Sequence, residues 1–501
     1  MKVKDLLQLL DLGSSVAEFD DALEKYFVET PTMRILVEDK ADIIAGDKGT
    51  GKTALYRILS KRYAGIPELN NVEVLAGFNP TGNPVFQRLT EGDALEEGQY
   101  VTIWKAYVLA LVGNWILQIY ESDYTGRMHE LQDLLRKTGL LSADDSPGTI
   151  FAQLVNLYRR ITTPKAAEVS MTITPHGIPL VVPRVEFEEP KLAEREEAIV
   201  RHDEALGLLN QVLDDVGVSA WVVLDRLDEA FQGFPAAEVP ALRALLRAYL
   251  DLAAFPRVRL KLFLRKDLFR RLIEGGFVNL THVNARKVEI VWDEEDLRHL
   301  LGKRIAENRP FLDAMGVGDK DYEEMFDLLF PPKVDPAEHK PTAWNWMMAR
   351  IRDGNDIKPP RNLIDLVKKA QEAQLRRENR SESEYNGPPI IHPESIRRGL
   401  AALSAERVND TLLAEAGEHT ALIERFRGGK AEHSEESVAQ VLGVDLGQAR
   451  EAIKVLREIG FLEVVGTSYK VPMLYRQGLG ITQGKAHAPG EAVPAPTDDD
   501  D

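Results

Sequence analysis

The pattern G-x-x-x-x-G-K-[ST] constrains this chain more than any other feature, and residues 46–53 match it without a mismatch. Ile43 and Ile44 end a short apolar run before the pattern, and residues 54–59 form a helix-favouring segment after it. The pattern therefore lies between a predicted strand and a predicted helix, which is the context that a phosphate-binding loop requires. The alternative is a glycine-rich turn that only shares these letters.

Each residue type in the loop has a physical reason. Gly46, Gly49 and Gly51 allow backbone N–H groups to approach an oxygen-rich anion without a Cβ clash, and the following helix points its positive end at the same place. We expect Lys52 to reach the β- and γ-phosphates of a nucleotide as a point charge. We expect the Thr53 hydroxyl to coordinate Mg²⁺.

A second stretch delivers carboxylates. Residues 221–224 are apolar and end at Asp225, as in a buried parallel strand whose carboxyl end reaches the edge of the sheet where α/β proteins place their sites. Asp225 is the expected carboxylate on the Mg²⁺ side. Asp228 and Glu229 are candidates to orient or deprotonate an attacking water. A core strand followed by an acidic helix cap is the alternative.

Four arginines are candidates to meet the phosphates. The predicted strand at residues 258–264 ends at Arg265, which could sense or stabilise a γ-phosphate or could be a solvated loop residue. Arg270 and Arg271 follow on a helix, as arginine fingers or as solvating charges. Arg361 follows a proline pair at a helix start, and it would face a nucleotide if this helical part folded down as a lid.

The chain length of 501 residues predicts about three domains, and we expect an α/β protein with a parallel sheet. The helical spacing of residues 102–119 predicts a buried helix whose tryptophans belong to the core. Residues 168–188 alternate as a β-hairpin, and residues 16–27 have the capping and spacing of a helix. The expected parts are an N-terminal helical segment at residues 1–40, a nucleotide-binding core at 41–290 with an insertion at about 143–189, a helical lid at 291–400, a winged helix at 401–480, and a disordered acidic tail at 481–501.

The winged-helix prediction rests on three helices followed by a small hairpin. The helices are expected at residues 412–426, 434–443 and 445–459, and the hairpin at residues 461–472. The third helix carries three cations against three acids, whereas phosphate contacts need surplus cations. A protein-contact role is therefore an open alternative to DNA binding.

Charge and cysteine content bear on whether the protein binds nucleic acid and on the compartment in which we expect it. The formal net charge of -18, from 80 acidic and 62 basic residues, repels nucleic acid overall, so DNA binding would need a locally basic surface. Cysteine is absent, which fits a reducing compartment. We find neither a cleavable leader pattern nor a run of about 18 uninterrupted apolar residues, so we expect a cytoplasmic protein without a membrane contact.

These motifs together resemble the signal-transducing P-loop ATPases of the STAND and KAP type, which are related to AAA+ proteins, with a layout similar to that of archaeal origin-recognition proteins. The resemblance spans roughly residues 14–479 and rests on four stretches: residues 46–55, 224–229, 263–267 and 360–363. It implies a P-loop NTPase core, a helical lid and a C-terminal winged helix. ATP, rather than GTP, is implied by the resemblance alone.

The resemblance also implies roles for single residues. It makes Asp225 the Walker B acid, Asp228 the second acid, Arg265 a sensor arginine and Arg361 a lid arginine. The nucleotide-contacting residues implied by the first stretch include the three loop glycines, Thr50, Lys52, Thr53 and Ala54. One departure from most AAA+ proteins is that Arg226, and not an acid, follows Asp225 directly, which implies slow or partner-stimulated hydrolysis.

The sequence therefore predicts an ATP-binding and ATP-hydrolysing switch that uses Mg²⁺, self-associates and acts with a separate partner or effector protein. Relatives of this broad type include components of bacterial anti-phage systems, so defence is one expected role. Two alternatives stay open: an ATP-regulated protein that binds or loads DNA through the winged helix, and a catalytically degenerate ATPase that serves as a scaffold.

Overall fold

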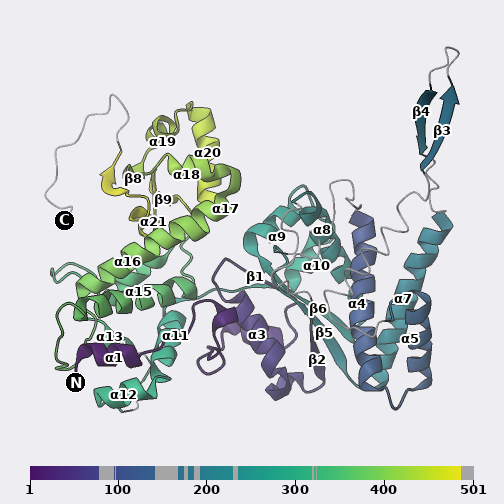
Figure 1. Cartoon of the computed structure of the whole chain (residues 1–501), viewed down its shortest axis with the longest axis horizontal. Coiled ribbons are helices and arrows are strands. Elements are labelled where there is room, and N and C mark those ends of the chain that lie inside the picture. The colour runs from purple at the N-terminus through teal and green to yellow at the C-terminus, as the bar shows by residue number, and fades with distance from the viewer. Residues whose placement is uncertain are drawn as a thin grey trace. The chain divides into compact units, whose positions relative to one another are not determined.

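The computed structural model describes residues 1–77, 95, 97–141, 167–173, 179–185, 192–229, 235–318, 321–322 and 324–486 (Figure 1). The chain divides into two compact units that interleave in sequence. The first unit comprises residues 1–30, 47–51 and 291–501, and the second comprises residues 31–46 and 52–290.

A five-stranded parallel sheet forms the centre of the second unit. Its spatial order is β2-β5-β6-β1-β7. The strands are β1 (Ile43–Gly46), β2 (Val72–Ala76), β5 (Ser219–Leu224), β6 (Val258–Arg265) and β7 (Lys287–Glu289). The apolar runs that predicted β1, β5 and β6 are buried as expected of parallel strands. The α/β class with a parallel sheet is thus confirmed.

Helices cover both faces of this sheet. The chain runs from β1 through α3 (Lys52–Arg62) to β2, and from β5 through α8 (Pro235–Leu252) to β6, in opposite directions across the sheet. Right-handed crossovers therefore place α3 on one face and α8 on the other (Figure 1). Helices α9 (Lys266–Ile273) and α10 (Leu280–Ala285) pack beside α8, and α2 (Pro31–Val37) precedes β1.

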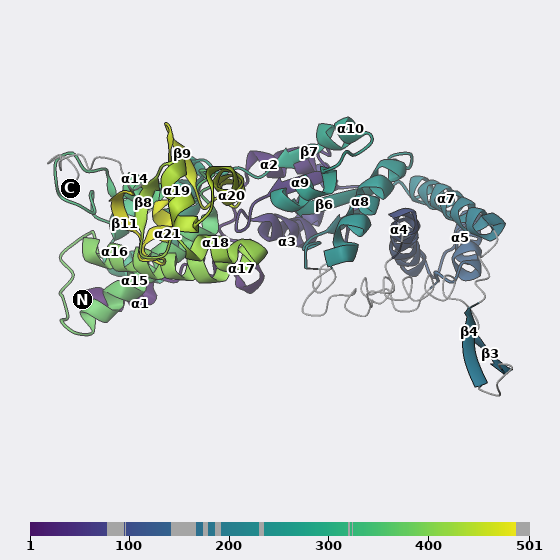
Figure 2. The same ribbon diagram turned by 90° about the horizontal axis from the view of Figure 1, so that it is seen from above.

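Three long helices extend the core beside α8. Helix α4 (Glu97–Ile119) packs against α8, α5 (Gly126–Lys137) and α7 (Leu192–Asp215) (Figure 2). Trp104 is fully buried in α4 and Trp115 packs partly buried against the same core, so the predicted core role of the two tryptophans is confirmed, whereas Ile119 at the end of the helix is 58% exposed. By length and composition α4 could cross a membrane, but 89% of its apolar window is buried inside the unit.

The predicted hairpin is also present. Strands β3 (Ala167–Ile173) and β4 (Pro179–Val185) pair antiparallel, with Ala167 opposite Val185. The remainder of the expected insertion, residues 143–166, 174–178 and 186–189, lies outside the described residues, as do residues 487–501 of the expected tail.

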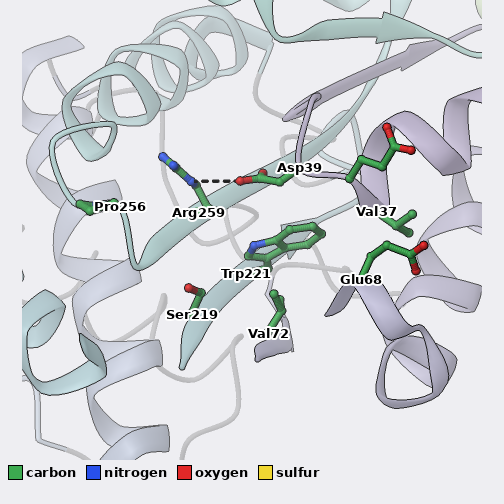
Figure 3. A pocket seen from close by; sticks show the side chains of 9 residues that line it. Val37, Asp39, Glu68, Val72, Ser219, Trp221, Pro256 and Arg259 are labelled. Atoms are coloured by element: carbon green, nitrogen blue, oxygen red, sulfur yellow. Dashed lines mark ion pairs between the residues drawn. The ribbon is translucent and has the colours of Figure 1, made fainter. Parts of the chain in front are cut away.

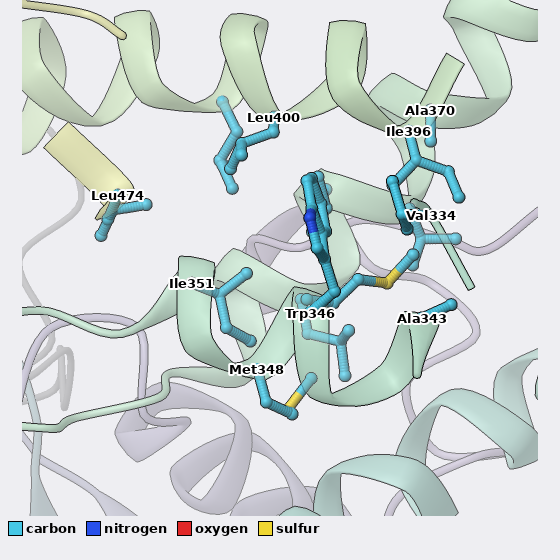
Figure 4. Close-up of a cluster of buried hydrophobic side chains, with 14 of the residues drawn as sticks. Val334, Ala343, Trp346, Met348, Ile351, Ala370, Ile396, Leu400 and Leu474 are labelled. Carbon is cyan, nitrogen blue, oxygen red and sulfur yellow. The ribbon is translucent and has the colours of Figure 1, made fainter. Parts of the chain in front are cut away.

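The first unit is built on one helical core. Side chains from α14, α16 and α21 converge in it, among them Trp346, Ile396, Leu400 and Leu474 (Figure 4). The helices of this unit that lie before residue 408 are α1 (Val3–Leu9), α11 (Glu294–Ala306), α12 (Arg309–Met315), α13 (Met325–Leu329), α14 (Ala343–Ile351), α15 (Pro360–Glu378) and α16 (Pro393–Arg407).

The helix expected at residues 16–27 is wrong. Only the short 3-10 turn Ala17–Phe19 forms there, and the Phe19 side chain is 79% exposed. Tertiary contacts account for the difference. Asp20 is buried, where it accepts hydrogen bonds from Tyr26 and from Arg304 at 2.9 Å. This buried ion pair forms in place of a continuous amphipathic helix.

The last part of the first unit combines helices with a small sheet of order β11-β8-β10-β9. The expected helix at residues 412–426 is broken at Gly417, where φ is +53°, into α17 (Ala414–Ala416) and α18 (Thr420–Glu424). The other elements are β8 (Lys430–His433), α19 (Glu435–Leu442), α20 (Leu446–Glu458), β9 (Glu463–Val465), β10 (Ser468–Lys470), α21 (Met473–Arg476) and β11 (Thr482–Lys485). Helices α19 and α20 and the β9–β10 hairpin match their predictions.

Helices α15 and α16 cross closely at Gly399. A Cβ added at Gly399 would lie 2.7 Å from the backbone nitrogen of Ala370, which cannot move aside as a side chain could. We expect Gly399→Ala to lower the free energy of unfolding by about 1–3 kcal/mol in urea titration. Gly318→Ala, where a Cβ would meet nothing within 4 Å, is the matched control and should change it little.

Candidate functional site

The phosphate-binding pattern lies between β1 and α3, as the sequence predicts. Gly46 is the last residue of β1, and Lys52 is the first residue of α3. Between them, Gly49 has a φ of +78° and Gly51 a φ of +98°, values that residues with a Cβ rarely adopt. The loop conformation therefore depends on glycine at these two positions.

Residues 47–51 are held by hydrogen bonds within the first unit. The Thr50 hydroxyl donates to the Asp47 carbonyl oxygen at 2.8 Å, so the predicted contact residue Thr50 shapes the loop with its side chain. Trp292 Nε1 donates to the Thr50 carbonyl oxygen at 2.8 Å. This hydrogen bond satisfies the Thr50 carbonyl oxygen and helps to fix the backbone of the loop.

The start of α3 carries the three predicted residues of the second unit. Lys52 Nζ donates to the Gly46 carbonyl oxygen at 2.9 Å, which folds the ammonium back over the start of the loop. The Thr53 hydroxyl hydrogen bonds to the carboxylate of Asp225. Ala54 is half-buried and can offer a ligand only its backbone and methyl group.

Sheet register brings Asp225 to the same edge. β6 lies between β5 and β1, and its last residue Arg265 pairs with Gly46. Asp225 directly follows β5 and is 1% exposed. Its Oδ2 atom has no hydrogen-bond partner among the described residues. Burial raises the pKa of Asp225 to about 6, although the Thr53 hydroxyl, the Arg226 N–H and the Lys52 charge favour the ionised form.

The pair formed by the Thr53 hydroxyl and Asp225 fits Mg²⁺. Within the described ranges no group of three or more His, Cys, Asp or Glu side chains could hold a metal ion by itself. Mg²⁺ does not need one, because it binds proteins through one or two oxygen ligands and takes the rest from water and phosphate. The unpartnered Oδ2 of Asp225 is the oxygen that such an ion would use.

The two candidate catalytic acids each have an arginine. Arg226 adopts a φ of +55°, unusual for a residue with a side chain, and its guanidinium contacts Glu229 at 3.3 Å. Arg265 forms a bidentate pair with Asp267 at 2.9 and 3.0 Å and lies 3.7 Å from Asp228. Arg265 is thus fixed at the sheet edge and is not a solvated loop arginine.

The remaining arginines fall in different places. In the first unit, a Cβ added at Gly49 would lie 3.0 Å from the Cβ of Arg361, so Arg361 packs on the loop. In the second unit, Arg271 pairs with Glu238 at 2.9 Å and Arg270 is exposed in the last turn of α9.

Sequence reasoning did not find three neighbours of the loop: Trp292, Asp353 and Pro359. Burial, with the charge of Asp47, raises the pKa of Asp353 to about 6 against two backbone N–H donors. Pro359 lies 3.4 Å from the position of a Cβ on Gly49. All three lie more than 200 residues after the loop in sequence. No local pattern marks such contacts, although Asp353-Gly354-Asn355 has turn composition.

A cavity of about 410 Å³ lies at the opposite edge of the sheet, where β2, β5 and β6 begin (Figure 3). Trp221 and Arg259 line it together with Asp39, which pairs with Arg259 at 3.7 Å. Asp39 also accepts a hydrogen bond from the fully buried Lys261 at 2.6 Å. The charge of Asp39 is thus balanced by ion pairs with Arg259 and Lys261. The cavity is separate from the candidate site, since none of the residues that line it belongs to that site.

Comparison with models of known protein families finds no match to this chain, and comparison with curated proteins finds none either.

The raised pKa of Asp225 predicts a pH-dependent cost in the metal-free protein. The carboxyl is neutral in both the folded and the unfolded state below about pH 4, and the cost of its buried charge develops as the pH rises to about 6. A shift of this size corresponds to about 3 kcal/mol. We therefore expect Asp225→Asn to raise the free energy of unfolding at pH 7.5 by up to about that amount, and to change it little at pH 4.

Urea titration with a metal chelator present measures this effect. Asp123→Asn removes an exposed charge from the same unit and is the control. An Asp225→Asn gain that was equal at both pH values would contradict the burial argument.

Proposed function

We propose that this chain binds ATP with Mg²⁺ and hydrolyses it slowly, as a nucleotide-dependent switch. The observation that carries the proposal is the hydrogen bond from Thr53, next to the lysine of the loop, to the buried carboxylate of Asp225. Two motifs that are more than 170 residues apart in sequence meet there with the chemistry that each alone predicts. ATP as the nucleotide rests on the resemblance.

The residues divide the work of binding. The loop backbone at Gly49 and Gly51 and the N-terminus of α3 would hold the phosphates, with Lys52 as their counter-charge. The Thr53 hydroxyl and Asp225 Oδ2 would hold the metal. Bound Mg²⁺ supplies charge neutralisation on the phosphate oxygens.

The arginine partners support slow hydrolysis. A carboxylate that faces a guanidinium is a weaker base, because the positive charge stabilises its ionised form. Arg226 contacts Glu229 at 3.3 Å, whereas Arg265 lies 3.7 Å from Asp228 and bonds mainly to Asp267. Asp228 is therefore the better candidate to orient the attacking water. A partner that drew Arg265 away would increase turnover.

We place the chain with P-loop NTPases of the AAA+ and STAND type, with residues 291–400 as a lid that presents Arg361 and residues 401–480 as a winged helix. The order β8, α19, α20 and then the β9–β10 hairpin supports the winged helix. Self-association, a separate effector protein, a cytoplasmic setting and a role in anti-phage defence belong to this proposal through the resemblance.

The C-terminal module favours a protein partner over DNA. Arg450 of α20, a candidate for phosphate contact, pairs with Glu435 at 2.8 Å. Val464 and Val465 on the β9 strand are 49% and 47% exposed. A helix without surplus cations and two exposed valines on the hairpin suit a protein surface better than a phosphate backbone.

Nucleotide binding and phosphate release by four single variants test the proposal. We expect Lys52→Ala to abolish binding of MgATP, and Lys48→Ala, which removes an exposed lysine of the same loop, to retain it. Asp228→Ala should keep the affinity and lower turnover by about 100-fold or more. Glu229→Ala should lower it by less than about 10-fold, because this acid is already held by Arg226.

Three outcomes would contradict the proposal or parts of it. Wild-type protein that binds neither MgATP nor MgGTP would refute nucleotide binding. Binding without turnover in the wild type would favour the scaffold alternative. Turnover stimulated by duplex DNA, and lost in Arg450→Glu, would favour the DNA-binding alternative.

A further inference from the structure

The segment from Arg352 to Arg361, here called the coupling segment, connects α14 to α15 within the first unit. It is closed on itself by Asp353. One carboxylate oxygen, Oδ1, accepts the N–H groups of Asn355 and Ile357, both at 2.9 Å, and the Asp353 N–H donates to the Ile357 carbonyl oxygen at 3.2 Å. Three hydrogen bonds around one aspartate make this turn a rigid piece.

One side of the coupling segment packs on the phosphate-binding loop. A Cβ at Gly49 would lie 3.0 Å from the Cβ of Arg361 and 3.4 Å from that of Pro359, so the backbones are close. The negative charge of Asp47 acts on Asp353 and adds to the effect of burial in raising its pKa. The loop and the segment thus interact both by packing and by charge.

The other side packs on the turn between α20 and β9. The Gly354 N–H donates to the Gly460 carbonyl oxygen at 2.7 Å, and a Cβ at Gly354 would lie 2.8 Å from that oxygen and from the Leu462 backbone. Arg352 pairs with Glu463, the first residue of β9, at 3.0 Å. These contacts are made by backbone and a short ion pair, so they leave no slack for independent movement.

We propose that the coupling segment transmits occupation of the phosphate-binding loop to the α20–β9 turn and thereby to the β9–β10 hairpin. The inference rests on the proposed nucleotide binding and specifies its regulation. Phosphate in the loop would add negative charge beside Asp47 and Asp353, and segments packed as closely as those at Gly49 and Gly354 would shift together. The β9–β10 hairpin then presents a different surface to a partner in each nucleotide state.

Hydrogen exchange of the full chain tests this proposal, with and without a slowly hydrolysed ATP analogue and Mg²⁺. In the wild type we expect amide exchange in residues 460–470 to change by about 5-fold or more on binding. In Gly354→Ala, whose added Cβ must displace the turn, and in Arg352→Gln, which only removes the pair with Glu463, the change should be lost although the nucleotide still binds. Gly318→Ala should behave like the wild type.

Binding measured on the same samples separates the two proposals. Wild-type protein that does not bind the analogue refutes the proposed function and this inference with it. Saturated binding without a change at residues 460–470 overturns the inference alone, and so does a full change that persists in either variant.

Discussion

The candidate site depends on one buried carboxylate. Asp225 directly follows the buried apolar residues of β5 and is itself buried, so ionising its carboxyl costs free energy of desolvation. The Thr53 hydroxyl, the Arg226 N–H and the Lys52 charge offset part of that cost, and the pKa of about 6 is what remains. A buried acid with one oxygen unpartnered among the described residues is stabilised further only when a cation arrives. The cost of this buried charge makes the metal-free protein less stable above about pH 6, and in the proposed function it would add to the affinity for Mg²⁺.

Charge pairing at the sheet edge bears on how fast the proposed site could hydrolyse a nucleotide. A fast hydrolase needs a carboxylate that is free to act on water, whereas here Glu229 faces Arg226, and Asp228 lies 3.7 Å from Arg265. Arg265 is shared, since its bidentate partner is Asp267. An arginine between two acids can exchange one for the other at little cost. Such an arrangement suits a protein in which the time spent with nucleotide bound carries the signal.

The sequence predicted the elements whose stability depends on residues close together in the chain, such as buried strands and helix caps. The apolar runs of β1, β5 and β6 could only be buried strands, and Ser434 and Asp445 begin their helices as N-caps that accept from backbone N–H groups, as their positions predict. The helix prediction for residues 16–27 was wrong because Asp20 and Tyr26 contact Arg304, a residue far away in sequence. The prediction of one continuous helix at residues 412–426 was wrong because Gly417 adopts a positive φ within an otherwise helical pattern. In the site, the two motif halves were visible, but Trp292 and Asp353 were not, since nothing in their surroundings distinguishes them from core and turn residues.

Hydrogen bonds to Asp353 close the turn between α14 and α15 in the first unit. A turn that merely linked α14 to α15 could tolerate many residues, but this one is closed around a carboxylate and fitted on both sides against backbone. Gly49, Gly354 and Gly460 are the contact points, and each lacks the side chain that would keep its neighbour at a distance. A Cβ at Gly354 would meet the backbone of Gly460 and Leu462, and a Cβ at Gly49 would meet the Cβ atoms of Arg361 and Pro359, so rotamer changes cannot absorb a small displacement at these two positions. In the proposed coupling, this segment joins residues 47–51 to the β9–β10 hairpin, although more than 400 residues separate them in sequence.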